Sequence, residues 1–200
     1  MSKVLEKGSK IVLALMVLAF LVFWDTSSPA TIIDFEDLYP GHPAYGSFPS
    51  SYAGFNWSSS SYWITKDQII GSGYDYGTIG LVSGFTGYAQ DISISTSSSF
   101  NFVSAYITAA WLTSLDVMVE GWKGGSMIYS QTITTHDDKP YQFLFNFMGI
   151  DTLWFRPLGS SDEKHIVIDN LEVSAVPLPS SLLLLGSGLA GLAAWRRLRV

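Results

Sequence analysis

Alternation of apolar and polar residues is the feature that most limits how this chain can fold. It runs through Leu115–Trp122, Tyr141–Phe147 and His165–Val173, and residues 31–175 contain no long stretch with the 3.6-residue period of a helix. A period of two, rich in β-branched and aromatic residues, predicts β-strands. Further strands are expected at Thr31–Phe35, Gly54–Trp57, Ile79–Val82, Gln90–Ser95, Phe100–Ala109, Ser126–Thr134 and Asp151–Arg156.

Turn-forming residues separate these runs. Trp122–Gly125 ends in a Gly-Gly pair, which tolerates positive φ and favours a hairpin. His136–Pro140 and Gly159–Lys164 are polar segments of the kind that connect strands. Short strands at regular spacing, without helices between them, predict an all-β fold. We therefore expect residues 31–175 to form a single antiparallel β-sandwich of the jelly-roll kind.

The N-terminus has the three regions of a secretory signal peptide. Lysines in the first ten residues precede the apolar run Ile11–Trp24, and small residues occupy positions 28 and 30. Because a membrane-spanning helix needs about 20 apolar residues, this run is short for an anchor. We expect residues 1–30 to be removed by signal peptidase after Ala30; an uncleaved membrane anchor is the alternative.

Charge and cysteine content exclude several kinds of site. Residues 31–175 contain five basic and fifteen acidic side chains, a formal net charge of −10. Nucleic acid is therefore not an expected partner, since binding its phosphates needs clustered Lys and Arg. With no cysteine in the chain, disulfides and thiolate metal sites are excluded, but carboxylates are available for Ca²⁺.

Two segments, residues 47–63 and 71–88, are rich in Ser, Gly, Tyr and Trp. They have three interpretations: loops between early strands, aromatic residues of the core, or a contact surface. Tyr and Trp supply rigid amphipathic area, as in binding loops, and can stack on sugar rings. The candidate ligand-binding residues are Trp57, Tyr62, Trp63, Tyr74 and Tyr76.

No sequence pattern selects a catalytic site. The three histidines, His42, His136 and His165, form no HExxH motif, and no G-x-S-x-G elbow occurs. Gly186–Gly191 fits G-x-G-x-x-G, but it follows no strand and belongs to no βαβ unit. We expect a non-catalytic protein. A glycan hydrolase, which needs two carboxylates about 5 to 9.5 Å apart, is the alternative.

The first and last strands suggest a metal site through a resemblance. Ile33–Leu38 and Ile168–Val173 resemble the opening and closing strands of carbohydrate-binding jelly-roll modules, which share a structural Ca²⁺. The resemblance implies Glu36 and Asp169 as ligands, with Asp34 or Asp37 as a third. Two ordinary terminal strands with their acids in solvent are the alternative. No other cofactor is expected.

Residues 176–200 read as a separate segment after the domain. Pro177 and Pro179 break secondary structure, and Leu182–Trp195 is entirely apolar or small, which predicts a short hydrophobic helix. Arg196, Arg197 and Arg199 follow and favour a cytoplasmic C-terminus. Since the signal peptide predicts export, the domain would lie outside and this tail would cross the membrane.

This tail resembles the PEP-CTERM sorting signal of exported proteins from Gram-negative bacteria that make exopolysaccharide. The resemblance assigns the motif to Pro177, Leu178 and Pro179 and the basic stop to the three arginines. It implies processing by an exosortase, an integral-membrane protease, after transient anchoring in the inner membrane. Leu178 departs from the pattern, which usually has glutamate there. The expected product is a surface or extracellular-matrix protein associated with polysaccharide; a permanently anchored structural protein is the alternative.

Overall fold

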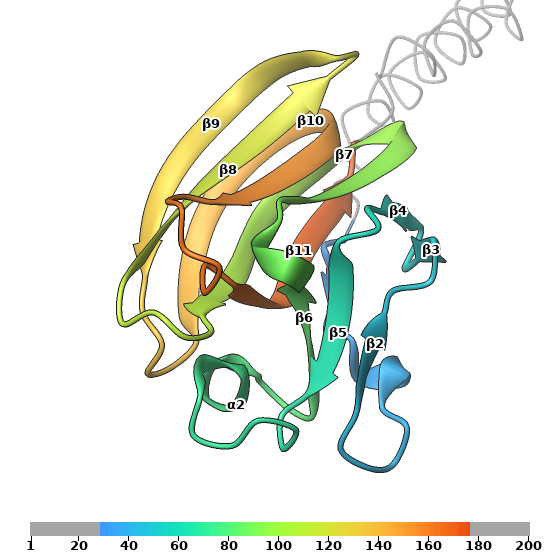
Figure 1. Ribbon diagram of the computed structural model, residues 1–200. Helices are drawn as coiled ribbons and strands as arrows, with labels where there is room; N and C mark the ends of the chain where they lie inside the picture. The colour runs from blue at the N-terminus through green and yellow to red at the C-terminus, as the bar shows by residue number, and fades with distance from the viewer. Residues whose placement is uncertain (1–28, 177–200) are drawn as a thin grey trace, which may run out of the picture. The chain divides into compact units, whose positions relative to one another are not determined.

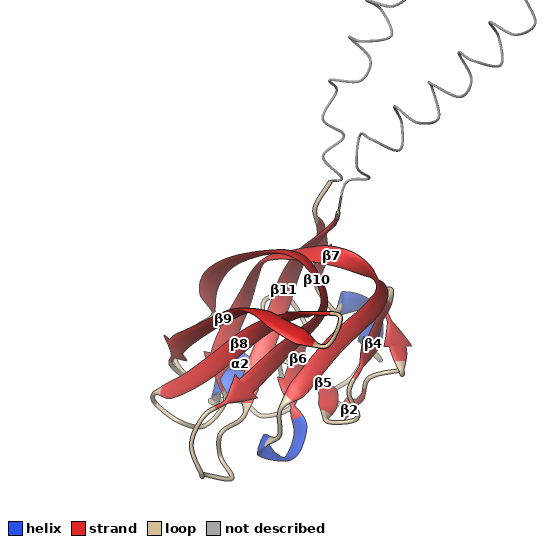
Figure 2. Ribbon diagram, turned by 90° about the horizontal axis from the view of Figure 1, so that it is seen from above, coloured by secondary structure: helices blue, strands red, loops and turns tan. Residues whose placement is uncertain are grey.

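Antiparallel pairing joins eleven strands into one sheet that folds into two layers (Figures 1 and 2). The computed structural model describes residues 29–176. The strands are β1 (Thr31–Ile33), β2 (Tyr45–Ser47), β3 (Ser51–Tyr52), β4 (Phe55–Trp57), β5 (Ser61–Thr65), β6 (Val82–Thr86), β7 (Ile92–Ala109), β8 (Leu115–Lys123), β9 (Ser126–Thr135), β10 (Tyr141–Pro157) and β11 (Ile166–Ala175). The helix α2 (Gly73–Gly77) and two 3₁₀ turns, Glu36–Leu38 and Gly87–Ala89, connect them.

Two long strands, β7 and β10, belong to both layers. The first residues of β7, Ile92–Ser95, pair with residues 152–155 of β10, and β4 joins them on the other side. After a bulge at residues 96–99, β7 continues as Phe100–Ala109 and pairs with β11 and with residues 141–150 of β10. One layer is therefore β2-β5-β6-β11-β7-β10, and the other is β4-β7-β10-β8-β9.

The main core lies between these two layers. The all-β sandwich predicted from the sequence is therefore confirmed. Alternate residues of each strand enter it, as the sequence pattern predicts. Leu115 and Val117 of β8 are buried, for example, whereas Asp116 between them is exposed. The hairpin at Gly124 and Gly125 is confirmed as well: both residues have positive φ, 56° and 78°, and they connect β8 to β9.

The structure corrects three expectations about the strands. The strand expected at Ile79–Val82 starts only at Val82, because residues 79–81 form a turn before β6. The segment 47–63 is not a set of loops, since it contains β3, β4 and most of β5. Finally, the separate strands expected at 90–95 and 100–109 are both parts of β7, and those at 141–147 and 151–156 are both parts of β10.

A bulge at Asn170 changes which face of β11 enters the core. Strict alternation would place Leu171 and Val173 on the same face as Val167. Asn170 has a φ of 45°, and the pairing of β11 with β7 shifts at this point. Leu171 and Val173 therefore join Ile166 and Ile168 in the main core, an arrangement that strict alternation in the sequence does not predict.

The predicted signal peptide and hydrophobic tail lie outside the residues that the structure describes. Between Pro29 and Val176, no helix is long and apolar enough to cross a membrane.

We predict that Gly73→Ala destabilises the protein. A Cβ at residue 73 would overlap the backbone carbonyl of Ala109, which cannot move aside as a side chain could. We expect the free energy of unfolding to fall by about 2 kcal/mol or more, measured by urea denaturation. The control is Tyr76→Ala on the exposed side of the same helix, for which we expect about 0.5 kcal/mol or less. Equal effects of both substitutions would contradict this account of the packing.

Candidate functional site

A second, smaller apolar cluster lies on the other face of the β5-β6-β11 layer. Two neighbouring residues of β5 contribute to different clusters. Trp63 packs against the main core, and Ile64 belongs to the second cluster. Helix α2 covers this cluster with Tyr74, which contacts Phe85 edge to face at 5.3 Å between ring centroids. This outer face of the sheet is therefore covered by packed side chains, against which further aromatic residues can pack.

Beside this cluster is a pocket of about 310 Å³. Two of its tyrosines are largely exposed: Tyr45 on β2 retains 64% of its accessible surface and Tyr88 retains 76%. Tyr62 on β5 also lines the pocket and packs against the second cluster. The pocket is lined by Tyr45, Tyr62, Phe85, Gly87, Tyr88 and His165.

The backbone holds Tyr88 in an unusual conformation. Its φ is 57°, a left-handed value that is uncommon for an aromatic residue and costs free energy. Gly87 allows the turn to lie against Tyr62, since a Cβ there would come within 2.5 Å of the ring. The rings of Tyr62 and Tyr88 then meet edge to face at 5.8 Å. A hydrogen-bond interaction with Tyr88 raises the pKa of Tyr62, so the Tyr62 hydroxyl stays protonated.

A hydrogen bond between Tyr74 and His165 supports the inner wall of the pocket. The Tyr74 hydroxyl lies 3.0 Å from His165 Nδ1, and Trp111 packs on the Tyr74 ring. Burial lowers the pKa of His165, so its ring is neutral at pH 7. Burial also raises the pKa of Tyr74. The wall is therefore uncharged and held in place by contacts between side chains.

The structure separates the five aromatic residues proposed from the sequence. Trp57 is buried in the main core, where it stacks on Phe48, and Trp63 packs against the same core from β5. These contacts give both tryptophans a packing role. Tyr74 is buried beneath the pocket, and Tyr76 is exposed on α2 but does not line it.

Of these five, Tyr62 alone lines the pocket. Sequence reasoning missed Tyr45, Tyr88 and His165. Tyr88 ends one of the aromatic-rich segments, but only its left-handed backbone, which a sequence does not display, marks it out. His165 comes from the far end of the chain.

Glu36 and Asp169 come together at one turn, although they lie at opposite ends of the domain. Glu36 Oε1 accepts hydrogen bonds from the backbone N–H groups of Leu81 and Val82, at 2.8 and 3.2 Å. Asp169 Oδ2 accepts one from Ile79 at 2.7 Å. Burial, together with the nearby negative charges of Glu36 and Asp34, raises the pKa of Asp169 to about 8. The two carboxylates therefore hold the turn before β6.

These acids meet only part of the requirement for Ca²⁺. The convergent negative charge favours a cation, but Ca²⁺ takes six to eight oxygen ligands. Both oxygens of Asp169 already accept backbone hydrogen bonds, and Asp34 Oδ1 accepts one from Glu36. In residues 29–176, no three His, Cys, Asp or Glu side chains form a group that could hold a metal ion. In the structure, Glu36 and Asp169 accept hydrogen bonds from backbone N–H groups.

An ion-pair network that the sequence did not suggest lies on the outer side of β8 and β10. Glu120, almost fully buried, accepts hydrogen bonds from Trp122 Nε1 at 2.9 Å and Arg156 Nε at 3.0 Å. Arg156 also pairs with Asp91 and lies 4.4 Å from the ring centre of Trp154. Every charge in this network has a partner, so its role is structural.

Comparison with protein families finds a match in the C-terminal segment of the chain. Residues 175–198 match the family model of the PEP-CTERM protein-sorting motif. The chain carries a PEP-CTERM sorting motif. A PEP-CTERM motif implies an exported protein that is anchored in the membrane transiently and processed by an exosortase. Apart from Ala175 and Val176, the matched residues lie outside those that the structure describes.

The domain before the PEP-CTERM motif has distant structural likenesses. A cyclase from Fischerella sp. is 9% identical and has a TM-score of 0.48, over 75% of this chain and 98% of that one. The K1 adhesin domain of Lys-gingipain from Porphyromonas gingivalis is 14% identical, with a TM-score of 0.43 over 68% and 100%. A family 29 carbohydrate-binding module from Piromyces equi is 12% identical, with 0.43 over 76% and 93%. Among curated proteins, none matches. Likenesses this distant assign no ligand.

We predict that Asp169 makes the protein less stable as pH rises from about 4 to about 8. The folded-state pKa of about 8 exceeds the usual 3.9, so the folded protein binds more protons than the unfolded chain in this range. Stability then falls by up to about 1.4 kcal/mol per pH unit. Asp169→Asn should flatten this dependence in urea denaturation with EDTA present, whereas Asp67→Asn, at an exposed acid, should leave it unchanged. An unaltered pH profile in Asp169→Asn would contradict the assignment.

Calcium binding stays a prediction of the resemblance. A Ca²⁺ site at Glu36 and Asp169 predicts a higher midpoint of thermal unfolding in CaCl₂ than in EDTA, because an ion that binds only the folded state stabilises that state. The same comparison in Asp169→Asn should show no difference. Equal midpoints for the wild-type protein would reject the site.

Proposed function

We propose that the exported domain is a non-catalytic glycan-binding module and that its ligand site is the pocket of Tyr45, Tyr62 and Tyr88. One observation carries this proposal. Aromatic rings that a globular domain normally buries are exposed around a hollow, and Tyr62 among them packs on the second cluster and contacts Tyr88. Trp57, Trp63 and Tyr74 keep packing roles, and Tyr76 is not part of the proposed site.

The chemistry of the lining fits a sugar. A pyranose ring presents apolar C–H faces that stack on tyrosine rings, and hydroxyl groups that bond with phenol and imidazole groups. The volume of about 310 Å³ lies at the lower end of the range for ligand pockets, 300–1,000 Å³. Such a site holds one or two sugar rings and leaves the remainder of a chain in solvent.

The charges favour a neutral glycan. Neither Asp nor Glu lines the pocket, and a domain with a formal net charge of −10 repels polyanions at low ionic strength. The same absence of carboxylates supports binding without hydrolysis, since glycoside hydrolysis in most families needs two of them. The ligand class we propose is therefore an uncharged polysaccharide or its end.

The sorting motif supplies the setting for this activity. We propose that the processed protein stays with extracellular polysaccharide at the cell surface or in the matrix. Leu178, where the signature usually has glutamate, is the point at which processing needs testing. Mass spectrometry of the mature protein decides between the two fates: a new C-terminus near Pro177–Pro179 supports release, and one at Val200 supports permanent anchoring.

We predict that removing either exposed ring weakens glycan binding. Tyr45→Ala deletes one ring, and Tyr88→Asn deletes another with a residue that tolerates the left-handed backbone. Loss of one stacking contact, worth about 1.4 kcal/mol, should weaken binding about tenfold on an array of neutral glycans. Tyr39→Ala, which removes an exposed tyrosine outside the pocket, is the matched control and should bind normally.

Two outcomes would reject this function. The first is an array on which the wild-type protein binds no glycan. The second is release of shorter sugars from a glycan incubated with the protein, which would favour the hydrolase alternative instead.

A further inference from the structure

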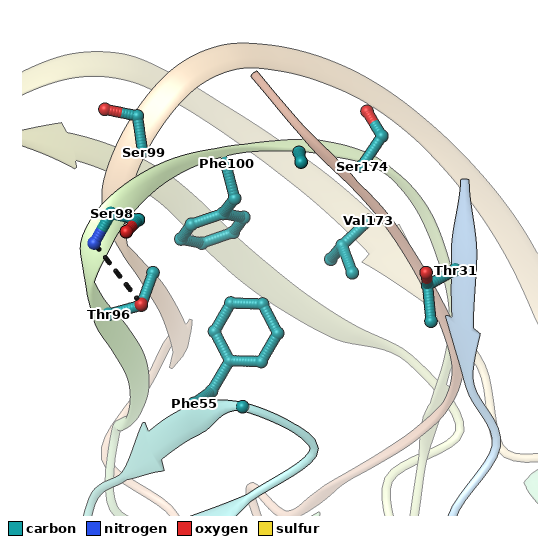
Figure 3. A pocket seen from close by; sticks show the side chains of 10 residues that line it. Thr31, Phe55, Thr96, Ser98, Ser99, Phe100, Val173 and Ser174 are labelled. Atoms are coloured by element: carbon teal, nitrogen blue, oxygen red, sulfur yellow. Dashed lines mark hydrogen bonds between the residues drawn. The ribbon is translucent and has the colours of Figure 1, made fainter. Parts of the chain in front are cut away.

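A second hollow lies at the end of the domain where the described chain begins and ends. Figure 3 shows Phe55 and Phe100 next to each other in its lining, and their rings meet edge to face with centroids 4.9 Å apart. The bulge of β7 at residues 96–99 forms one wall, and β11 forms the other. The hollow has a volume of about 200 Å³ and is lined by Thr31, Gly54, Phe55, Thr96, Ser98, Ser99, Phe100, Val173, Ser174 and Ala175.

The sorting motif begins inside this folded structure. The family match starts at Ala175, which is the last residue of β11 and pairs with Phe100. One residue, Val176, separates it from Pro177. No linker therefore separates the folded domain from the Pro-x-Pro motif in the sequence. Any protein that reads the start of the motif must come against this end of the domain.

The lining of this hollow carries no charge. None of the ten lining residues is ionisable, although residues 29–176 contain fifteen acids and five bases. Lys123, which lies next to the hollow, donates to Ser99 and pairs with Asp151 at 3.8 Å. Covering a charge with a membrane protein or lipid costs several kcal/mol, whereas hydroxyl groups can form new hydrogen bonds.

We propose that this hollow is a docking surface for the membrane protease that processes the sorting motif. Its apolar floor receives a side chain of the protease, and its Ser and Thr rim supplies hydrogen bonds around it. The proposal rests on the sorting function and goes beyond it, because it makes the folded domain part of what the protease recognises.

The test measures processing of the full chain in a host that makes the matching exosortase. Ser98→Glu places a charge on the exposed rim, and Ser130→Glu places the same charge on the exposed side of β9, away from the hollow. Fractions of processed protein come from mass spectrometry after a pulse of synthesis. We expect Ser98→Glu to be processed at least fivefold more slowly than the wild type and Ser130→Glu at the normal rate.

A linker makes the test specific for the hollow. Eight Gly/Ser residues inserted between Val176 and Pro177 move the motif away from the domain. With the linker, the wild type and Ser98→Glu should be processed at the same rate, because the domain end no longer contacts the protease. Thermal unfolding of each purified variant checks that the fold is intact.

Three results would overturn the proposal. They are normal processing of Ser98→Glu, equal slowing of Ser98→Glu and Ser130→Glu, and a difference that persists with the linker. Complete absence of processing of the wild-type chain would contradict the sorting function as well. Glycan binding at the tyrosine pocket is measured separately and does not depend on any of these outcomes.

Discussion

The pairing of β7 with β10 is the interaction on which the rest of the structure depends. Each strand is long enough to cross from one layer to the other, and they stay paired on both sides of the bulge at residues 96–99. Because one strand pair serves both layers, the core between them closes without a disulfide, in a chain that has no cysteine. The bulge that permits the crossing also forms a wall of the hollow beside Phe100.

The two ends of the domain are joined in a similar way. β1 pairs with residues 171–173 of β11, and beside them Glu36 and Asp169 hold the turn that leads into β6. The N–H groups that these side chains accept from are exposed or partly buried, so each bond contributes about 0.5–1.5 kcal/mol to stability. The cost is visible in the raised pKa of Asp169, because burial beside two other acids disfavours its negative charge. The first and last segments of the domain therefore stabilise each other.

The sequence predicted what periodicity and turn chemistry control. The alternation of β8 and the Gly-Gly hairpin led directly to the observed strands, since both are local signals. Bulges were not predictable, because Asn170 has a side chain that is compatible with an ordinary strand and only its φ of 45° changes the face of Leu171. The length of β7 was not predictable either, because the polar residues of its bulge at 96–99 are typical of a loop between two strands.

The candidate site was predicted less well than the fold, and the reason is physical. A tyrosine that fills a core and a tyrosine that faces solvent look the same in a sequence, since either can stand beside Ser and Gly. Tyr62 was among the proposed residues, but Tyr45 and His165 reach the pocket only through the pairing of distant strands. The sorting motif was the reverse case. It is read as a linear segment, so its residues could be assigned without a fold.

The central claim is that the exposed tyrosines form a sugar-binding pocket. The most direct measurement is a crystal structure of the exported protein with a neutral oligosaccharide that it binds. The account predicts a sugar ring against Tyr45 or Tyr88, in the pocket that His165 borders. A sugar bound elsewhere, for example across Trp122 and Trp154 on β8 and β10, would contradict it.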